Sequence, residues 1–194
     1  LGTENADAVD FSATTISGLP ISASALQGYS GLEGLKIDLL DGSDVVTISG
    51  TPNGLALYLV GNNGDDSFSV TNFSSFSNYS LRLFGEDGED SLSLDTLTGG
   101  IGTLNKNSLT GFGLPQPLEF DTFEDLTLNL GSGDDTLTID GWSAVEELDL
   151  TLNYAAGSDT LDVQSAALDL NGGDFTKNGA GTLTFSGSGI DSSQ

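Results

Sequence analysis

The chain has 194 residues, of which 37% are hydrophobic, so it can fold around an elongated core. Its 29 acidic residues face only four basic ones, giving a formal net charge of −25. This balance excludes nucleic-acid binding and anionic membrane surfaces, because both require clustered Lys and Arg. The absence of cysteine excludes a disulfide framework and thiolate metal sites. We also expect no membrane insertion, because no apolar run approaches the ~18 residues of a membrane helix.

Short segments of alternating apolar and polar residues, joined by acidic turns, predict β-strands along most of the chain. The pattern is clearest where Leu126, Leu128 and Leu130 alternate with polar residues, an acidic Gly-Ser-Gly-Asp-Asp turn follows at 131–135, and alternation resumes. In chain order, such strand, turn and strand units are expected over 35–48, 55–70, 81–94 and 123–139, and more loosely over 148–163.

The acidic turns recur at a nearly constant spacing. From Asp44, the steps to Asp66, Asp90, Asp135 and Asp159 are 22, 24, 45 and 24 residues, and 45 is close to two steps. A period of this length is typical of repeats that stack on one another. We therefore expect an all-β parallel β-solenoid, in the form of a right-handed β-helix of about eight rungs with the acidic Gly-Asp turns on one edge.

A longer repeat is also present. Residues 29–48 align with residues 120–139 at a constant offset of 91, which indicates duplication of a unit of about 90 residues. We expect one β-solenoid domain over 1–194, with duplicated units at about 1–84 and 85–165 and terminal rungs at 166–194. The irregular stretch 95–119 is expected to carry a longer loop or hairpin. Because the chain starts at Leu1 without an initiator Met or signal segment, it is expected to be part of a longer precursor.

Two segments resemble known families. The stretch Phe-Thr-Lys-Asn-Gly-Ala-Gly-Thr-Leu-Thr-Phe-Ser-Gly at 175–187 resembles the autotransporter-associated β-strand repeat, whose pattern is close to T-K-x-G-x-G-T-L-x-L-S-G. That resemblance implies a secreted, extracellular β-helix of a large bacterial surface protein. The acidic turns at 61–69 and 85–93 resemble the calcium-binding nonapeptide of the repeats-in-toxin family, G-G-x-G-x-D-x-U-x. This second resemblance implies bound Ca2+.

Stacked acidic turns would need counter-charge. Carboxylates about 4.8 Å apart repel each other, and calcium accepts irregular sites of six to eight oxygens. The alternative is ordinary tight-turn chemistry, in which each Asp caps its own backbone and the carboxylates point into water. Turn glycines at 42, 61, 64, 85, 88, 131, 133 and 157 are expected to allow positive φ. The candidate calcium ligands are Asp44, Asp65, Asp66, Asp87, Asp90, Asp134, Asp135 and Asp159.

Catalysis is not expected. There is no His or Cys, the four basic residues are scattered, and no nucleophile elbow, phosphate loop or His-based metal motif occurs. Glu33 and Glu124 precede strands and are expected to bond to turns rather than to bind metal. The aromatic residues are expected to pack in the core or at corners more than to form a sugar-stacking face. These aromatics are Tyr58, Phe73, Phe76, Tyr79, Phe112, Trp142 and Tyr154.

The composition and repeats favour a structural role. We expect a repeat segment of an extracellular bacterial adhesin or matrix protein, stabilised by calcium, with divalent cations as its simplest partners. One alternative is an adhesin module that binds a glycan or another surface protein. Another is a subunit that self-associates end to end into a filament, because the outer strands of a repeat stack present unpaired edges.

Overall fold

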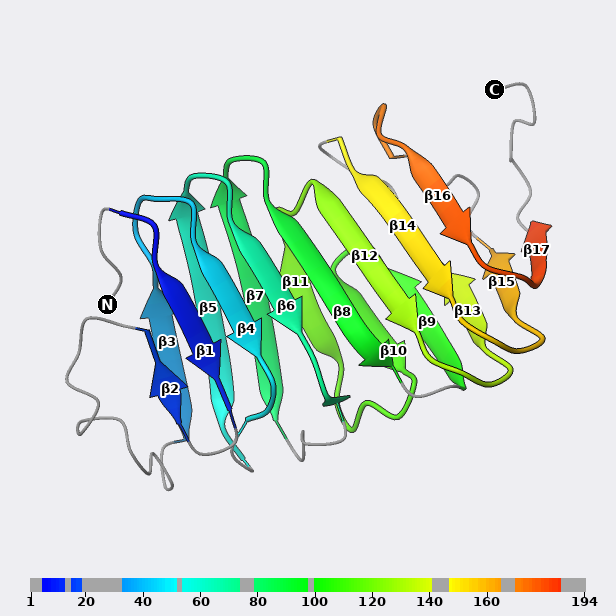
Figure 1. The fold of residues 1–194 in the computed structure, drawn as a ribbon, viewed down its shortest axis with the longest axis horizontal. Helices are drawn as coiled ribbons and strands as arrows, with labels where there is room; N and C mark the ends of the chain where they lie inside the picture. Colours follow the sequence, from blue (N-terminus) through cyan, green and yellow to red (C-terminus); the bar gives the residue numbers. More distant parts are fainter. Residues whose placement is uncertain are drawn as a thin grey trace.

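Two β-sheets lie face to face around an elongated apolar core in the computed structural model, which describes residues 5–12, 15–18, 33–51, 54–73, 79–97, 100–140, 147–164 and 170–185 (Figure 1). Sheet A, in front in Figure 1, has eight strands and sheet B has nine. Sheet A contains, in spatial order, β16 (Phe175–Asn178), β14 (Asp149–Tyr154), β12 (Asp125–Leu130), β8 (Ser91–Leu97), β6 (Ser67–Val70), β4 (Val45–Ile48), β1 (Ala8–Phe11) and β2 (Ile16–Ser17). Sheet B contains β17 (Thr182–Phe185), β15 (Thr160–Val163), β13 (Thr136–Ile139), β9 (Ile101–Asn105), β10 (Ser108–Gly111), β11 (Leu118–Asp121), β7 (Ser80–Asp87), β5 (Ala56–Asn63) and β3 (Gly34–Asp38).

Most of the strand pairs are parallel. From β3 to β9 and from β12 to β17, successive strands alternate between the two sheets, and each pairs with a strand of the neighbouring repeat. The register follows the sequence period, so that Leu57 lies opposite Leu81 and Leu128 opposite Leu152. Equivalent positions of successive repeats therefore form columns along the long axis of the molecule.

The sheets are mixed, however, and the prediction of a parallel β-solenoid built as a right-handed β-helix of about eight rungs is wrong. β1 pairs antiparallel with β2, and β10 pairs antiparallel with both β9 and β11. For β10 the cause lies in the irregular stretch, where a turn at Lys106 and Asn107 sends β10 back along β9. Three consecutive strands then lie in sheet B before the chain returns to sheet A at β12.

The same hairpin divides the acidic turns between two edges, so the prediction of a single acidic edge is also wrong. Asp44, Asp66 and Asp90 directly precede the sheet A strands β4, β6 and β8. Asp135 and Asp159 instead precede the sheet B strands β13 and β15. Because β9, β10 and β11 stay in one sheet, the 45 residues from Asp90 to Asp135 complete one and a half circuits rather than two. The two groups lie at opposite ends of the strands (Figure 1).

The core is built from the inward positions of both sheets. Residues at these positions alternate with outward ones along each strand, as the two-residue period of a strand requires. Leu59, Leu83 and Ile139 are fully buried. Phe112 fills the space left by Gly102, whose Cβ would lie 2.1 Å from the Phe112 ring. Each fully buried Leu, Ile, Val or Phe side chain of the core stabilises the fold by about 1.5–3 kcal/mol.

Within the described part of the chain, no helix is long and apolar enough to cross a bilayer.

Candidate functional site

The first aspartate row consists of Asp44, Asp66 and Asp90, which stack at the entrances of β4, β6 and β8. Each of these residues is at most 1% exposed. Asp66 Oδ1 accepts the backbone N–H of Asp44 at 2.7 Å, and Asp90 Oδ1 accepts that of Asp66 at 2.8 Å. Glu124 continues the row, because its Oε2 accepts the Asp90 N–H at 2.7 Å. Each acid of the row therefore ties two successive repeats together.

The second aspartate row, Asp135 and Asp159, has the same geometry at the entrances of β13 and β15. Asp135 Oδ1 accepts the N–H of Gly100 at 2.7 Å, and Asp159 Oδ1 accepts the N–H of Asp135 at 3.0 Å. Both carboxyl groups are buried. The structure thus separates the five most regularly spaced Asp residues into two rows but gives all five the same bonding role.

The second carboxyl oxygen, Oδ2, of all five aspartates is buried and has no hydrogen-bond partner. Glycines make room for two of them. A Cβ on Gly61 would lie 1.9 Å from Asp66 Oδ2, and a Cβ on Gly85 would lie 2.3 Å from Asp90 Oδ2. Gly64 and Gly88 do adopt positive φ, as expected. Gly61 and Gly85 do not, so they are required for space rather than for backbone conformation.

Burial is the main influence on the acidity of these groups. The pKa of Asp66 is raised to about 7 and that of Asp90 to about 6, mainly by burial; the charges of neighbouring acids add to this rise, and the backbone hydrogen bonds oppose it. Burial also raises the pKa of Asp44 and Asp135. Among the described residues the one ion pair joins Arg82 to Glu119 on sheet B, so no cation is paired with either row.

The other predicted acids lie at the exposed tips of the turns. Asp65, Asp87 and Asp134 are all exposed. Asp65 Oδ1 accepts the N–H of Glu89 at 3.2 Å, and Asp134 Oδ1 accepts that of Ser158 at 2.8 Å. Both bonds reach across to the next repeat, 24 residues away, rather than capping the turn of the acid itself.

In the described residues, the eight predicted calcium ligands are not gathered around one point. Calcium requires six to eight oxygens around one point. In the described residues, no three acid side chains converge in a way that could hold a metal ion. Each buried aspartate also accepts a hydrogen bond from a backbone amide with one carboxyl oxygen. At Asp66 and Asp90, the other carboxyl oxygen packs against a glycine. We therefore assign none of them as a metal ligand, and calcium binding stays a prediction of the sequence.

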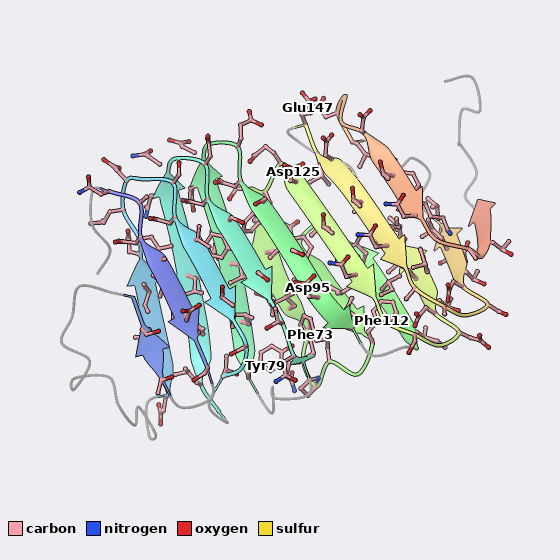
Figure 2. The ribbon with its side chains drawn as sticks, viewed as in Figure 1. Phe73, Tyr79, Asp95, Phe112, Asp125 and Glu147 are labelled. Atoms are coloured by element: carbon pink, nitrogen blue, oxygen red, sulfur yellow. The ribbon has the colours of Figure 1, made fainter. Side chains whose placement is uncertain are left out.

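A polar ladder on the outer face of sheet A was missed by the sequence reasoning. It starts at Asp95, labelled in Figure 2, which accepts hydrogen bonds from the Ser69 and Ser93 hydroxyls and from Asn129 Nδ2. The bonds continue from Asn153 to Asn129 at 2.7 Å and from Asn178 to Asn153 at 2.8 Å. The signal was present as an Asn two residues after the Thr at 127, 151 and 176.

Most of the described aromatics are packed inside, as expected. Phe73, Tyr79, Phe112 and Tyr154 are buried. The first three are labelled in the lower half of Figure 2, and the Tyr79 hydroxyl donates to the Gln116 carbonyl at 3.2 Å. Phe76 and Trp142 lie outside the described residues.

Tyr58 is the exception, because it lies on the outer face of sheet B. Its ring stacks on Phe84 with centroids 4.7 Å apart, and Lys36 Nζ lies 5.1 Å from its centroid. Lys36, Tyr58 and Arg82 are aligned on three adjacent strands. We call this group the sheet B patch; it gathers two of the four basic residues of the chain.

Comparison with protein-family models, with curated proteins and with solved structures found no match.

Substitution of Glu124 provides a first test of the row. Glu124→Ala leaves the Asp90 N–H without its acceptor, so we expect the free energy of unfolding to fall by about 1–2 kcal/mol. Glu124→Gln keeps an acceptor oxygen and should cost less than half as much. Urea titrations followed by circular dichroism measure both, and equal losses would contradict the bond to Asp90.

Proposed function

We propose that this chain is a structural segment of an extracellular bacterial surface or secreted protein, and that it serves as a stiff spacer. The supporting observation is that the contacts of the strands run between repeats and in register along one axis. Apolar columns, aspartate rows and the Asn ladder all join one repeat to the next. Little in the described residues gathers groups for catalysis at one point.

The mechanics of the stack follow from this arrangement. The first and last described strands lie at opposite ends of the long axis (Figure 1). Each repeat contacts mainly its neighbours, and such arrays unfold as coupled repeats rather than as one indivisible unit. A force applied through the two ends therefore acts on the outer repeats first.

Single-molecule pulling tests the spacer role. We expect a series of force peaks, each releasing one repeat of 22 to 24 residues, or about 8 nm of extended chain, except that the repeat with the inserted hairpin releases more. Glu124→Ala should lower one peak and leave the others unchanged. A chain that extends at low force without peaks would contradict a load-bearing role.

A second candidate function is a glycan-binding or partner-binding module, which the sheet B patch favours. Tyr58 and Phe84 provide aromatic surface and Lys36 and Arg82 provide hydrogen-bond donors, on the outer face of an otherwise acidic molecule. A glycan array probed with the wild-type chain and with Tyr58→Ala separates the two functions. Glycan binding by the wild-type chain that is lost in Tyr58→Ala supports a binding module. If no glycan on the array binds the wild-type chain, the spacer role is supported.

A further inference from the structure

The buried second oxygens of Asp66 and Asp90 lie near backbone carbonyl oxygens. The position that a Cβ would take on Gly85 lies 2.3 Å from Asp90 Oδ2 and 2.2 Å from the Thr122 carbonyl oxygen. At Gly61, the corresponding distances are 1.9 Å to Asp66 Oδ2 and 2.8 Å to the Gly85 carbonyl oxygen. Two acceptors thus share one small buried space, and no hydrogen-bond donor reaches either Oδ2. A desolvated carboxylate oxygen without a donor is costly.

Every charged group that acts on Asp66 and Asp90 is an acid. Asp44 and Asp90 act on Asp66 from the two neighbouring repeats, and Asp65 acts on it from its own turn. Asp65, Asp87 and Glu89 act on Asp90, and Glu124 bonds to its backbone. The basic groups with described contacts lie elsewhere: Lys36 is over Tyr58, Arg82 pairs with Glu119, and Lys177 is over Tyr154.

We infer that Asp66 and Asp90 of the first row become carboxylic acids in mildly acidic solution, so that protons rather than metal ions neutralise this row and make the stack tighter in acid. A proton on Oδ2 converts an unpaired acceptor into a donor close to a backbone carbonyl oxygen. It also removes the charge that repels the next acid of the row. Oδ1 remains free to accept the amide of the preceding repeat, so one proton satisfies both needs.

The direction of the pH effect follows from the position of the pKa. In the unfolded chain an Asp titrates near 3.8, whereas burial places the pKa of Asp90 at about 6 and that of Asp66 at about 7. The folded state binds more protons than the unfolded state between these values. The stabilisation is therefore complete below the unfolded pKa, and it is lost as the pH rises through 6 and 7.

Asparagine substitutions test the inference, because an Asn side chain has the shape of a protonated Asp and keeps both an acceptor and a donor. The wild-type melting temperature should rise by several degrees when the pH is lowered from 8 to 5. Asp66→Asn/Asp90→Asn should melt on the order of 5 °C higher than wild type at pH 8 and show a flatter pH dependence. The control, Asp65→Asn/Asp87→Asn, removes the same charge from exposed positions of the same turns.

The control separates protonation of the row from a general relief of charge repulsion. Equal stabilisation by the two double variants at pH 8 would overturn the inference. A calcium titration at pH 8 is a second test. If calcium raises the melting temperature of the control Asp65→Asn/Asp87→Asn but not that of Asp66→Asn/Asp90→Asn, the row binds metal and the inference is overturned.

Infrared spectroscopy observes the protons directly and does not depend on whether the variants fold. In the wild-type chain at pH 6, the carbonyl band of un-ionised carboxylic acid should be present, and it should disappear as the pH is raised to 8. A spectrum with ionised carboxylates alone at pH 6 would overturn the inference, and persistence of the band into the neutral range supports it.

Discussion

Phe68→Ala is expected to lower the free energy of unfolding by about 3–5 kcal/mol. Phe68 is 1% exposed on β6, in the middle of sheet A. Its ring meets the Phe123 ring edge to face, with centroids 5.4 Å apart. Removal of the ring leaves a cavity between two sheets whose strands are held in register on both sides, so the neighbouring repeats cannot close the gap. Urea denaturation followed by circular dichroism measures the loss.

Phe84→Ala is the matched control. Phe84 has the same side chain but lies half-buried on the outer face of sheet B, stacked on Tyr58. Its removal opens no cavity in the core, and we expect a loss of about 1 kcal/mol. Similar losses for the two variants would mean that the inner columns are not the main source of stability.

The strands and their inward positions could be predicted from the sequence, because alternation with a period of two is a local property. The same alternation also indicates which acid of each turn is buried. Asp66 precedes Phe68 and Val70 at two-residue steps, in phase with the buried positions, whereas Asp65 is out of phase and exposed. The same phase buries Asp44 and Asp90. Burial of the last acid of each turn was therefore predictable from the sequence. The exposure of the acid directly before it, such as Asp65 before Asp66, was predictable for the same reason.

The mixed topology and the two acidic edges could not be predicted from the repeat period. A step of 45 residues fits two circuits of the chain as well as one circuit and a half with an inserted hairpin. The difference depends on whether the chain after Ile101–Asn105 continues into sheet A or folds back into sheet B, and that depends on the non-local pairing of β11 with β7. The side-chain bonds of the Asn ladder likewise depend on the register of separate repeats.

The aspartate rows and the apolar columns act on stability in different ways. Burial of apolar side chains supplies most of the driving force, and it is indifferent to small changes in pH. The rows fix the register, because each Oδ1 accepts one particular amide of the preceding repeat. A shift of one residue would place every inward acid on the surface and every apolar neighbour in water. Buried acids are therefore tolerated where they specify which residues of two repeats are aligned.

The backbone of the turns is stacked as closely as the side chains, so Gly64→Ala is expected to cost about 3–5 kcal/mol of unfolding free energy. Gly64 has a φ of +122°, and a Cβ there would lie 2.2 Å from the carbonyl oxygen of Gly42 in the preceding repeat. Gly54→Ala is the control, since Gly54 also has a positive φ, +83°, but a Cβ there meets nothing within 4 Å. Gly54→Ala should therefore lose only the free energy needed to hold an alanine at positive φ, about 1–2 kcal/mol. The difference between the two melting curves therefore measures the contact between successive turns, and equal losses would show that conformation alone makes glycine necessary at position 64.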